Sequence, residues 1–592
     1  MIKTLLKSVR QYKKPSIITP LFMALEALCE CLIPFCMAKM ITAIDVQGIA
    51  ANEAMLQIVK YGAFLLGLAL LSLTSGALAG RFAATASCGF AKNLRQDLFY
   101  KVQGFSFSNV DKFSTSSLVT RLTTDVTNVQ QSYQMCLRIA VRVPLQFIFA
   151  IIMSFVINPK LAWIFLAIMP FLGAGIFSIV FYVVPFFRRI FKKYDALNNS
   201  VQENVGGIRV VKSFVREDYE IKKFQKAAGE VRNDFEKAEK ILALNTPMMT
   251  FFMNFASVMI SAFAAYAIVD KFHWAAFDGF GKGDLSALIS YGIQMLSCLM
   301  MFSMVFVMIT MSIESARRIS EVLKENVDLQ SPENGLKTVK DGAIRFENVN
   351  FKYSEKAHKF ALANINLDIR SGETVGILGG TGSAKTTLIQ LIPRLYDTSE
   401  GAVYVGGENV KNYDLDALRS EVAVVLQKNV LFSGTIKENL RWGNENASDE
   451  ELIRVCKLAQ AHEFVSSFPD GYDTYIEQGG TNVSGGQKQR LCIARALLKK
   501  PKVLILDDST SAVDTKTDAL IRKAFAEEIP DTTKIIIAQR VSSVEHADKI
   551  LILDGGEIVA CGNHAQLMEN SDIYREIYEA QTKGKNEEGG NE

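Results

Sequence analysis

The chain has 592 residues, of which 49% are apolar and 21% are charged, and its formal net charge is +3. At roughly 150 residues per domain, this length predicts two or more folding units. The composition excludes a disordered or collagen-like chain, and the small net charge argues against a dedicated nucleic-acid-binding protein. Nine scattered cysteines form neither a disulfide framework nor a CxxC metal site. We therefore expect a membrane domain joined to a soluble one.

The apolar excess lies in the N-terminal half of the sequence. Six runs there are long enough for helices that cross a hydrocarbon core of roughly 30 Å, at residues 15–44, 55–79, 139–157, 161–187, 248–269 and 285–313. Lys and Arg gather before the first run and after the second, fourth and sixth. Because basic loops stay on the cytoplasmic side, the pattern predicts a multi-pass protein of the plasma membrane with both termini in the cytoplasm.

Two connections between these runs, at residues 80–138 and 188–247, are unusually long. Both have amphipathic or charged helical patterns, so we expect the spans to continue as helices beyond the bilayer. Each has a polar break, at residues 105–117 and 216–219, and these tips are placed to touch a soluble domain.

From residue 341 the pattern changes to short β-rich runs, at 344–351, 365–369 and 374–378, that alternate with helical stretches. This alternation is typical of an α/β domain. We thus predict an all-α bundle of six spans over residues 1–320, a linker over 321–340, an α/β domain over 341–581 and a disordered tail over 582–592.

The strand at 374–378 leads into a phosphate-binding loop. Such a loop needs small residues whose backbone N–H groups surround an anion, a Lys for the outer phosphates and a hydroxyl for Mg²⁺. The residues are Gly379, Gly380, Thr381, Gly382, Ser383, Ala384, Lys385, Thr386 and Thr387. The usual glycine before the Lys is Ala384, and we expect this alanine to adopt right-handed helical angles that leave the loop intact.

Two further motifs accompany the loop. A buried strand ends at Asp507 and Asp508, and Asp507 is placed to hold the magnesium shell directly or through water. Upstream, Ser484, Gly485, Gly486 and Gln487 begin a basic helix, and this turn is a second candidate anion site.

The order of these motifs resembles that of ATP-binding cassette (ABC) proteins, and with six spans the chain resembles a half-transporter of the ABC exporter family with the type IV fold. The resemblance implies ATP and Mg²⁺ as ligands, with Thr386, Gln427 and Asp507 as the metal residues. It implies that Tyr353 stacks on adenine, that residues 511–514 cross a dimer interface and that the tips at 105–117 and 216–219 are coupling helices.

The sequence departs from the family at its hydrolytic residues. The family has a Glu as general base where this chain has Asp508, whose carboxylate lies roughly 1.5 Å further back. A misplacement of about 1 Å can cost on the order of 100-fold in rate. The family has a His where this chain has Gln539, which cannot carry a positive charge. The segment at 477–480, before the signature, also differs from the family pattern.

The signature from Ser484 to Gln487 matches the family pattern. Asp508, Gln539 and Ala384 differ from that pattern, and all three belong to this chain's own nucleotide site. This distribution resembles the degenerate-site subunit of a heterodimeric multidrug exporter. It predicts ATP-driven export of amphipathic or hydrophobic compounds by a dimer of this chain and a second half-transporter. In that dimer, the signature of this chain would contact, in trans, the ATP bound to the second half-transporter. The alternatives are a homodimeric exporter of lipid or peptide and an ATP-gated regulator or channel.

Glu26 and Glu30 lie one helical turn apart inside the first span. Carboxylates in hydrocarbon are costly and usually face the interior of a bundle. Two interpretations stay open: a contact for cationic substrates, or a structural role, either as a hydrogen bond or through proximity to the cytoplasmic water layer. The partners expected are thus membrane lipid, a small-molecule substrate and a second half-transporter, with no nucleic acid.

Overall fold

A computed structural model describes residues 1–45, 51–269, 280–355, 357–508 and 513–588 of the chain. The chain divides into two compact units, Met1–Gln103 with Thr115–Glu325 and Gly104–Ser114 with Asn326–Glu592. The division after Glu325 falls inside the expected linker. The segment Gly104–Ser114 belongs to the second unit although it lies in the sequence of the first.

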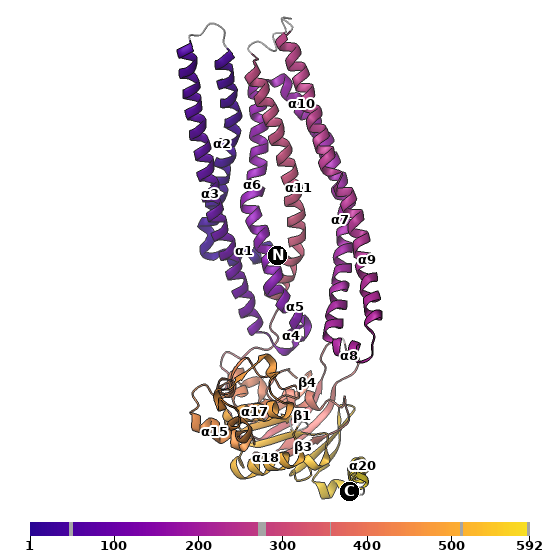
Figure 1. The fold of residues 1–592 in the computed structure, drawn as a ribbon. Coiled ribbons are helices and arrows are strands. Elements are labelled where there is room, and N and C mark those ends of the chain that lie inside the picture. The colour runs from indigo at the N-terminus through magenta and orange to yellow at the C-terminus, as the bar shows by residue number, and fades with distance from the viewer. Residues whose placement is uncertain (46–50, 270–279, 356, 509–512, 589–592) are drawn as a thin grey trace. The chain divides into compact units, whose positions relative to one another are not determined.

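The described residues of the first unit are almost all helical, and they include six helices that are long and apolar enough to cross a membrane, as expected. In Figure 1, α2 and α3 run side by side, as do α6 and α11. The helices are α1 (Ile2–Leu6), α2 (Lys13–Asp45), α3 (Ala51–Gln103), α5 (Thr115–Thr120), α6 (Val126–Ile157), α7 (Pro159–Gly206), α8 (Ile208–Ser213), α9 (Glu217–Leu242), α10 (Asn245–Val269) and α11 (Lys282–Lys324), with a 3₁₀ turn at Lys7–Tyr12 and a π-helix at Arg121–Asp125.

The long helices end where the sequence gives clear signals. Asn158 caps α7, its side chain accepting from the N–H groups of Lys160 and Leu161, and Pro159 fills the first helical position. The second polar break was predicted at residues 216–219, but α9 already begins at Glu217. The chain breaks instead at Gly207 and around Val215, which has a φ of 51°.

The second unit contains the predicted α/β domain. Its six-stranded sheet has the order β12-β11-β3-β10-β9-β6, beside a four-stranded sheet in the order β2-β1-β4-β5 and the pair β7-β8. The strands are β1 (Ile344–Phe351), β2 (Leu362–Ile369), β3 (Thr374–Leu378), β4 (Glu400–Val405), β5 (Glu408–Asn409), β6 (Val422–Val425), β7 (Gly434–Thr435), β8 (Tyr475–Ile476), β9 (Val503–Asp507), β10 (Thr533–Ile537), β11 (Lys549–Asp554) and β12 (Glu557–Gly562).

Helices cover these strands and connect them. They are α4 (Phe107–Phe113), α12 (Lys385–Leu391), α13 (Leu415–Glu421), α14 (Ile436–Arg441), α15 (Asp449–Leu458), α16 (His462–Ser466), α17 (Gly485–Leu498), α18 (Thr515–Glu528), α19 (His564–Asn570) and α20 (Asp572–Glu588). The last helix runs through residues 582–588, which the sequence analysis assigned to a disordered tail. The Lys and Glu residues at its end have a high helix propensity, so a low apolar content does not by itself prevent a helix there.

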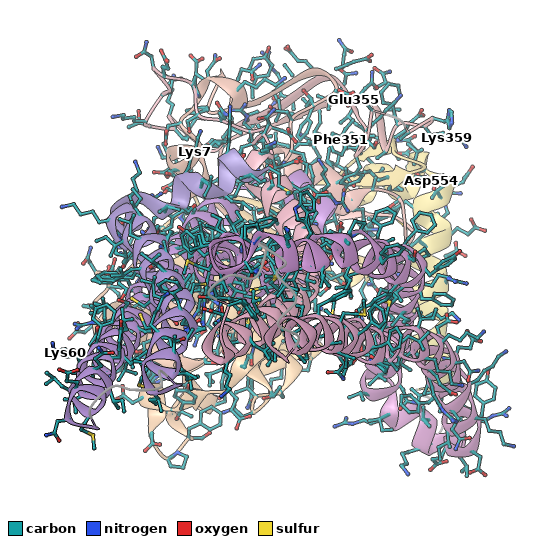
Figure 2. The ribbon with its side chains drawn as sticks, turned by 90° about the horizontal axis from the view of Figure 1, so that it is seen from above. Lys7, Lys60, Phe351, Glu355, Lys359 and Asp554 are labelled. Carbon is teal, nitrogen blue, oxygen red and sulfur yellow. The ribbon has the colours of Figure 1, made fainter. Side chains whose placement is uncertain are left out.

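Strand order places the candidate site. The neighbours β3, β10, β9 and β6 are all parallel, so their carboxyl ends meet at one edge of the sheet. At another edge, Ala363 donates its N–H to the Gly556 carbonyl oxygen, which joins the start of β2 to the β11–β12 turn. Figure 2 shows Phe351, Glu355, Lys359 and Asp554 on that side of the unit.

Candidate functional site: an ATP-binding edge

Four parallel strands bring the predicted ATP residues together at one edge. The phosphate loop follows β3, Gln539 follows β10, Asp507 and Asp508 lie at the end of β9, and Gln427 follows β6. In the loop, Lys385 Nζ donates to the carbonyl oxygens of Gly379 and Gly380, both at 2.8 Å. Burial lowers the pKa of this ammonium, while the charges of Asp507 and Asp508 oppose the shift.

The expectation for Ala384 is wrong. Ala384 caps the start of α12 with φ 70° and ψ 23°, in the left-handed region and not the right-handed one. The loop must turn sharply here to point its N–H groups inward, which is why glycine is the usual residue. A Cβ in this region costs roughly 1–2 kcal/mol, so Ala384 keeps the loop's shape under backbone strain.

Thr386 and Asp507 form the metal side of the site. Thr386 Oγ1 donates to Asp507 Oδ2 at 2.9 Å, and only 2% of Asp507 is exposed. Burial raises the pKa of Asp507, and the hydrogen bond from Thr386 opposes that shift. A hydroxyl and a carboxylate in contact are the hard oxygen ligands that Mg²⁺ prefers, so these residues fit the ion that the resemblance implies.

Asp508 is held by two glutamine amides. Its Oδ2 accepts from Gln539 Nε2 at 2.7 Å and lies 3.4 Å from Gln427 Nε2. Its backbone is in the left-handed region, with φ 47°, and its carbonyl oxygen accepts from Gln489 Nε2 at 3.2 Å. Burial raises the pKa of this carboxyl, and the two amides oppose the shift. Asp508, Gln427 and Gln539 lie in three separate segments of the sequence, and the structure brings both glutamine amides to Oδ2 of Asp508.

The signature begins α17, as predicted. Ser484 Oγ accepts from the N–H of Gln487 at 3.2 Å, and Gln487 Oε1 accepts from the N–H of Ser484 at 2.9 Å. This capping box leaves Ser484 and Gly485 exposed. The same helix reaches the hydrolytic residues through Gln489, which the sequence analysis did not single out. Of the expected interface loop, Ser511 and Ala512 lie outside the described residues.

Tyr353 lies in an aromatic group beside the phosphate loop. Its hydroxyl is 2.8 Å from Thr387 Oγ1, and its ring, which is half exposed, makes an edge contact with Tyr396 at 5.3 Å. Tyr396 in turn donates to Asp111 Oδ2 at 2.7 Å and lies edge-on to Phe107, both in α4. The expectation that the first polar tip contacts the α/β domain is thus confirmed, and Tyr396 is a contact that no motif indicated.

Glu26 and Glu30 share one guanidinium in the membrane unit. Arg142 Nη2 binds Glu30 at 2.6 and 2.7 Å, and Arg142 Nη1 lies 3.2 Å from Glu26 Oε1. This geometry favours the structural one of the two interpretations over a free carboxylate pair waiting for a cation. The signal was present in the sequence, because Arg138 and Arg142 repeat the four-residue spacing of the glutamates.

Comparisons with known proteins agree with this site. Residues 16–280 match the family model described as the ABC transporter transmembrane region, and residues 362–511 match the model described as ABC transporter. The chain is 36% identical to YfiB of Bacillus subtilis (strain 168), an uncharacterized ABC transporter ATP-binding protein, over 97% of this chain and 98% of that protein. It is 32% identical to Rv1273c of Mycobacterium tuberculosis, described in the same words, over 98% of each chain.

A solved bacterial Atm1-family ABC exporter with ATP bound has the same fold, with a TM-score of 0.81 over 97% of this chain and 98% of that one, at 23% identity. Fold and site together define an ATP-driven membrane transporter. The chain belongs to the ABC transporter family, as a half-transporter that carries one membrane domain and one ATPase domain. The ATPase domain binds ATP with Mg²⁺.

Proposed function

We propose that this chain is the degenerate-site half of a heterodimeric exporter of amphipathic or hydrophobic compounds. The observation that supports this proposal is the hydrogen bonding of the Asp508 side chain, whose Oδ2 accepts from Gln539 Nε2 at 2.7 Å. A general base must offer a free carboxylate oxygen to its water. Here the side chain is one methylene shorter than the family's glutamate, and amides already bond one of its two carboxylate oxygens, Oδ2.

The other residues of the site support ATP binding without rapid hydrolysis. Lys385 and the loop N–H groups hold the phosphates, and Tyr353 offers a ring face for the base. A magnesium ion held by Thr386 and Asp507, with Gln427 near it, would neutralise charge on the outer phosphates. Because Gln539 is neutral, it supplies no cation to the developing charge at this site.

The intact signature supports a role toward a second chain. Ser484 and Gly485 are exposed at the N-terminus of a fourteen-residue helix, α17, with N–H groups and helix dipole suited to a phosphate. We assign these residues to the partner's ATP, where the partner's own glutamate performs hydrolysis. ATP binding at both sites closes the nucleotide domains and turns the bundle outward, and hydrolysis at one site resets it.

The distribution of basic residues favours a plasma-membrane location with both termini in the cytoplasm. The first helices carry Lys3, Lys7, Lys13 and Lys14, whereas the α6–α7 junction has a single basic residue, Lys160, in the first turn of α7.

Substitution of the base tests the proposal. In the transporter co-purified with its partner, Asp508→Glu combined with Gln539→His is expected to raise ATP turnover at this chain's site about 100-fold, because base and charge are both restored. Asp508→Asn is the control and should leave turnover as it is. A wild-type chain that purifies alone as a stable, fast ATPase would favour the homodimer instead.

A further inference from the structure

The C-terminal helix α20 places a glutamine against the loop that follows β10. Tyr574 of this helix is fully buried, and Ile577 and Tyr578 pack against the same core. Gln581 comes seven positions after Tyr574, so it lies on the same face of the helix. The apolar stripe of α20 therefore ends in a side-chain amide.

The amide of Gln581 bonds the loop on both sides of Arg540. Its Oε1 accepts from the N–H of Val541 at 2.8 Å, and its Nε2 donates to the carbonyl oxygen of Gln539 at 3.0 Å. Val541 begins a 3₁₀ turn, Val541–Ser543, and within the described chain the Arg540 side chain does not cap it. Because the first N–H groups of a helical turn have no partner inside it, Gln581 supplies the missing acceptor from another element.

Other bonds fix the chain on either side of this contact. Before it, Ala538 donates its N–H to a carbonyl oxygen of β3 at 3.2 Å. After it, Arg522 of α18 donates to the carbonyl oxygen of Ser542 at 3.0 Å. Gln581 therefore acts on the short piece between two fixed points, residues 539–541.

This short piece carries the side chain that reaches the ATP edge. Gln539 Nε2 donates to Asp508 Oδ2 at 2.7 Å. The neighbouring Asp507 accepts from Thr386 of the phosphate loop. Because β10 and β3 are parallel neighbours, Gln539 and the phosphate loop follow the same edge of the sheet. The direction of the Gln539 side chain depends on the backbone angles at residue 539, and the bond from Gln581 holds the carbonyl group of that residue.

We propose that Gln581 is a positioning residue for the nucleotide site. Acting through the backbone of residues 539–541, it holds the Gln539 amide where the outer phosphates of ATP bind. The inference needs only ATP binding by this unit, so it is independent of the proposed pairing with a second half-transporter. None of the motifs indicates this role, because Gln581 and Gln539 are 42 positions apart in the sequence.

The experiment compares two nucleotides on the full chain in detergent with Mg²⁺. They are ADP and AMP-PNP, an ATP analogue that is not hydrolysed, and the ratio of their dissociation constants reports the contacts made by the terminal phosphate. Gln581→Met keeps the length of the side chain and removes both hydrogen bonds. We expect it to lower the preference for AMP-PNP about fivefold, the effect of about one hydrogen bond, while ADP binding stays unchanged.

A double-mutant cycle separates positioning from a general loss of structure. Gln539→Ala removes the positioned amide itself and should lower the preference by about the same factor. Gln581→Met added to Gln539→Ala should then change nothing further, because no amide is left to position. Glu576→Met, at an exposed position of the same helix, is the control and should leave the ratio as it is.

Gln581→Glu provides a second variant with the same expected direction. It keeps an acceptor for the Val541 N–H but turns a carboxylate toward the Gln539 carbonyl oxygen. An unchanged preference in both Gln581 variants would overturn the proposal, as would equal weakening of ADP and AMP-PNP or losses that multiply in the double variant. A wild-type chain that proves to be a fast homodimeric ATPase contradicts the proposed function and leaves this result standing.

Discussion

Two residues at the ATP edge hold backbone angles that their side chains disfavour. Ala384 has a φ of 70° and Asp508 a φ of 47°. Aspartate tolerates the left-handed region because its short polar side chain bonds locally, whereas alanine gains nothing there. Both residues also depart from the family pattern, Ala384 at a glycine of the phosphate loop and Asp508 at the general-base glutamate. Two of the positions at which this site departs from the family pattern are therefore also positions of backbone strain.

Replacing Ala384 by Gly should relieve this strain. We expect the nucleotide-binding unit to gain about 1 kcal/mol of stability, because glycine adopts a φ of 70° without a Cβ clash. The melting temperature of the purified protein, followed by a probe on the second unit, measures the gain. Ala526→Gly, at an exposed position inside α18, is the control and should lose about 1 kcal/mol. Loss of stability in both variants would refute the strain.

At the residue scale, the phosphate loop could be predicted from the sequence because it is built from consecutive residues. Contacts between distant positions were not. Gln539 and Asp508 are 31 positions apart, and Arg142 and Glu30 are 112 apart, so no sequence window contains either pair. The backbone angles of Ala384 depend on how the phosphate loop joins α12, so the usual preference of alanine for right-handed angles did not predict them.

At the scale of elements, the short helix α4 is fixed to the α/β domain by a few side chains. Tyr396 Oη donates to Asp111 at 2.7 Å, and Ser108 Oγ donates to Asp328 at 2.8 Å. Because Tyr396 also makes an edge contact with Tyr353, the residue expected to stack on adenine is one ring away from α4. The sequence indicated that this tip touches the domain, but nothing in it indicated which residue receives it.

Tyr396→Phe should loosen α4 while keeping the ring contacts. Loss of one hydrogen bond of about 1 kcal/mol predicts roughly fivefold faster hydrogen exchange for the amides of Gly104–Ser114. Tyr404→Phe, on β4, is the control and should leave that exchange unchanged. Unaltered exchange in Tyr396→Phe would mean that the hydroxyl does not hold the helix.

At the scale of the whole molecule, the sequence predicted both units and placed their division within the linker. It assigned residues 105–117 to the membrane part, whereas Gly104–Ser114 packs with the ATPase unit. Composition averages over a segment, so it could not detect a short helix that folds with another domain. Our proposal that the chain is one half of an asymmetric dimer rests on the intact signature beside the departures at Asp508 and Gln539.

The fate of the γ-phosphate on each chain tests this asymmetry most directly. The assembled transporter is loaded with γ-labelled 2-azido-ATP, allowed one turnover and then photolysed, and the label on each chain is counted. The account predicts that the partner loses its γ-label while this chain retains it, because Asp508 is short and bonded to Gln539. Loss of the label from both chains at the same rate would contradict it.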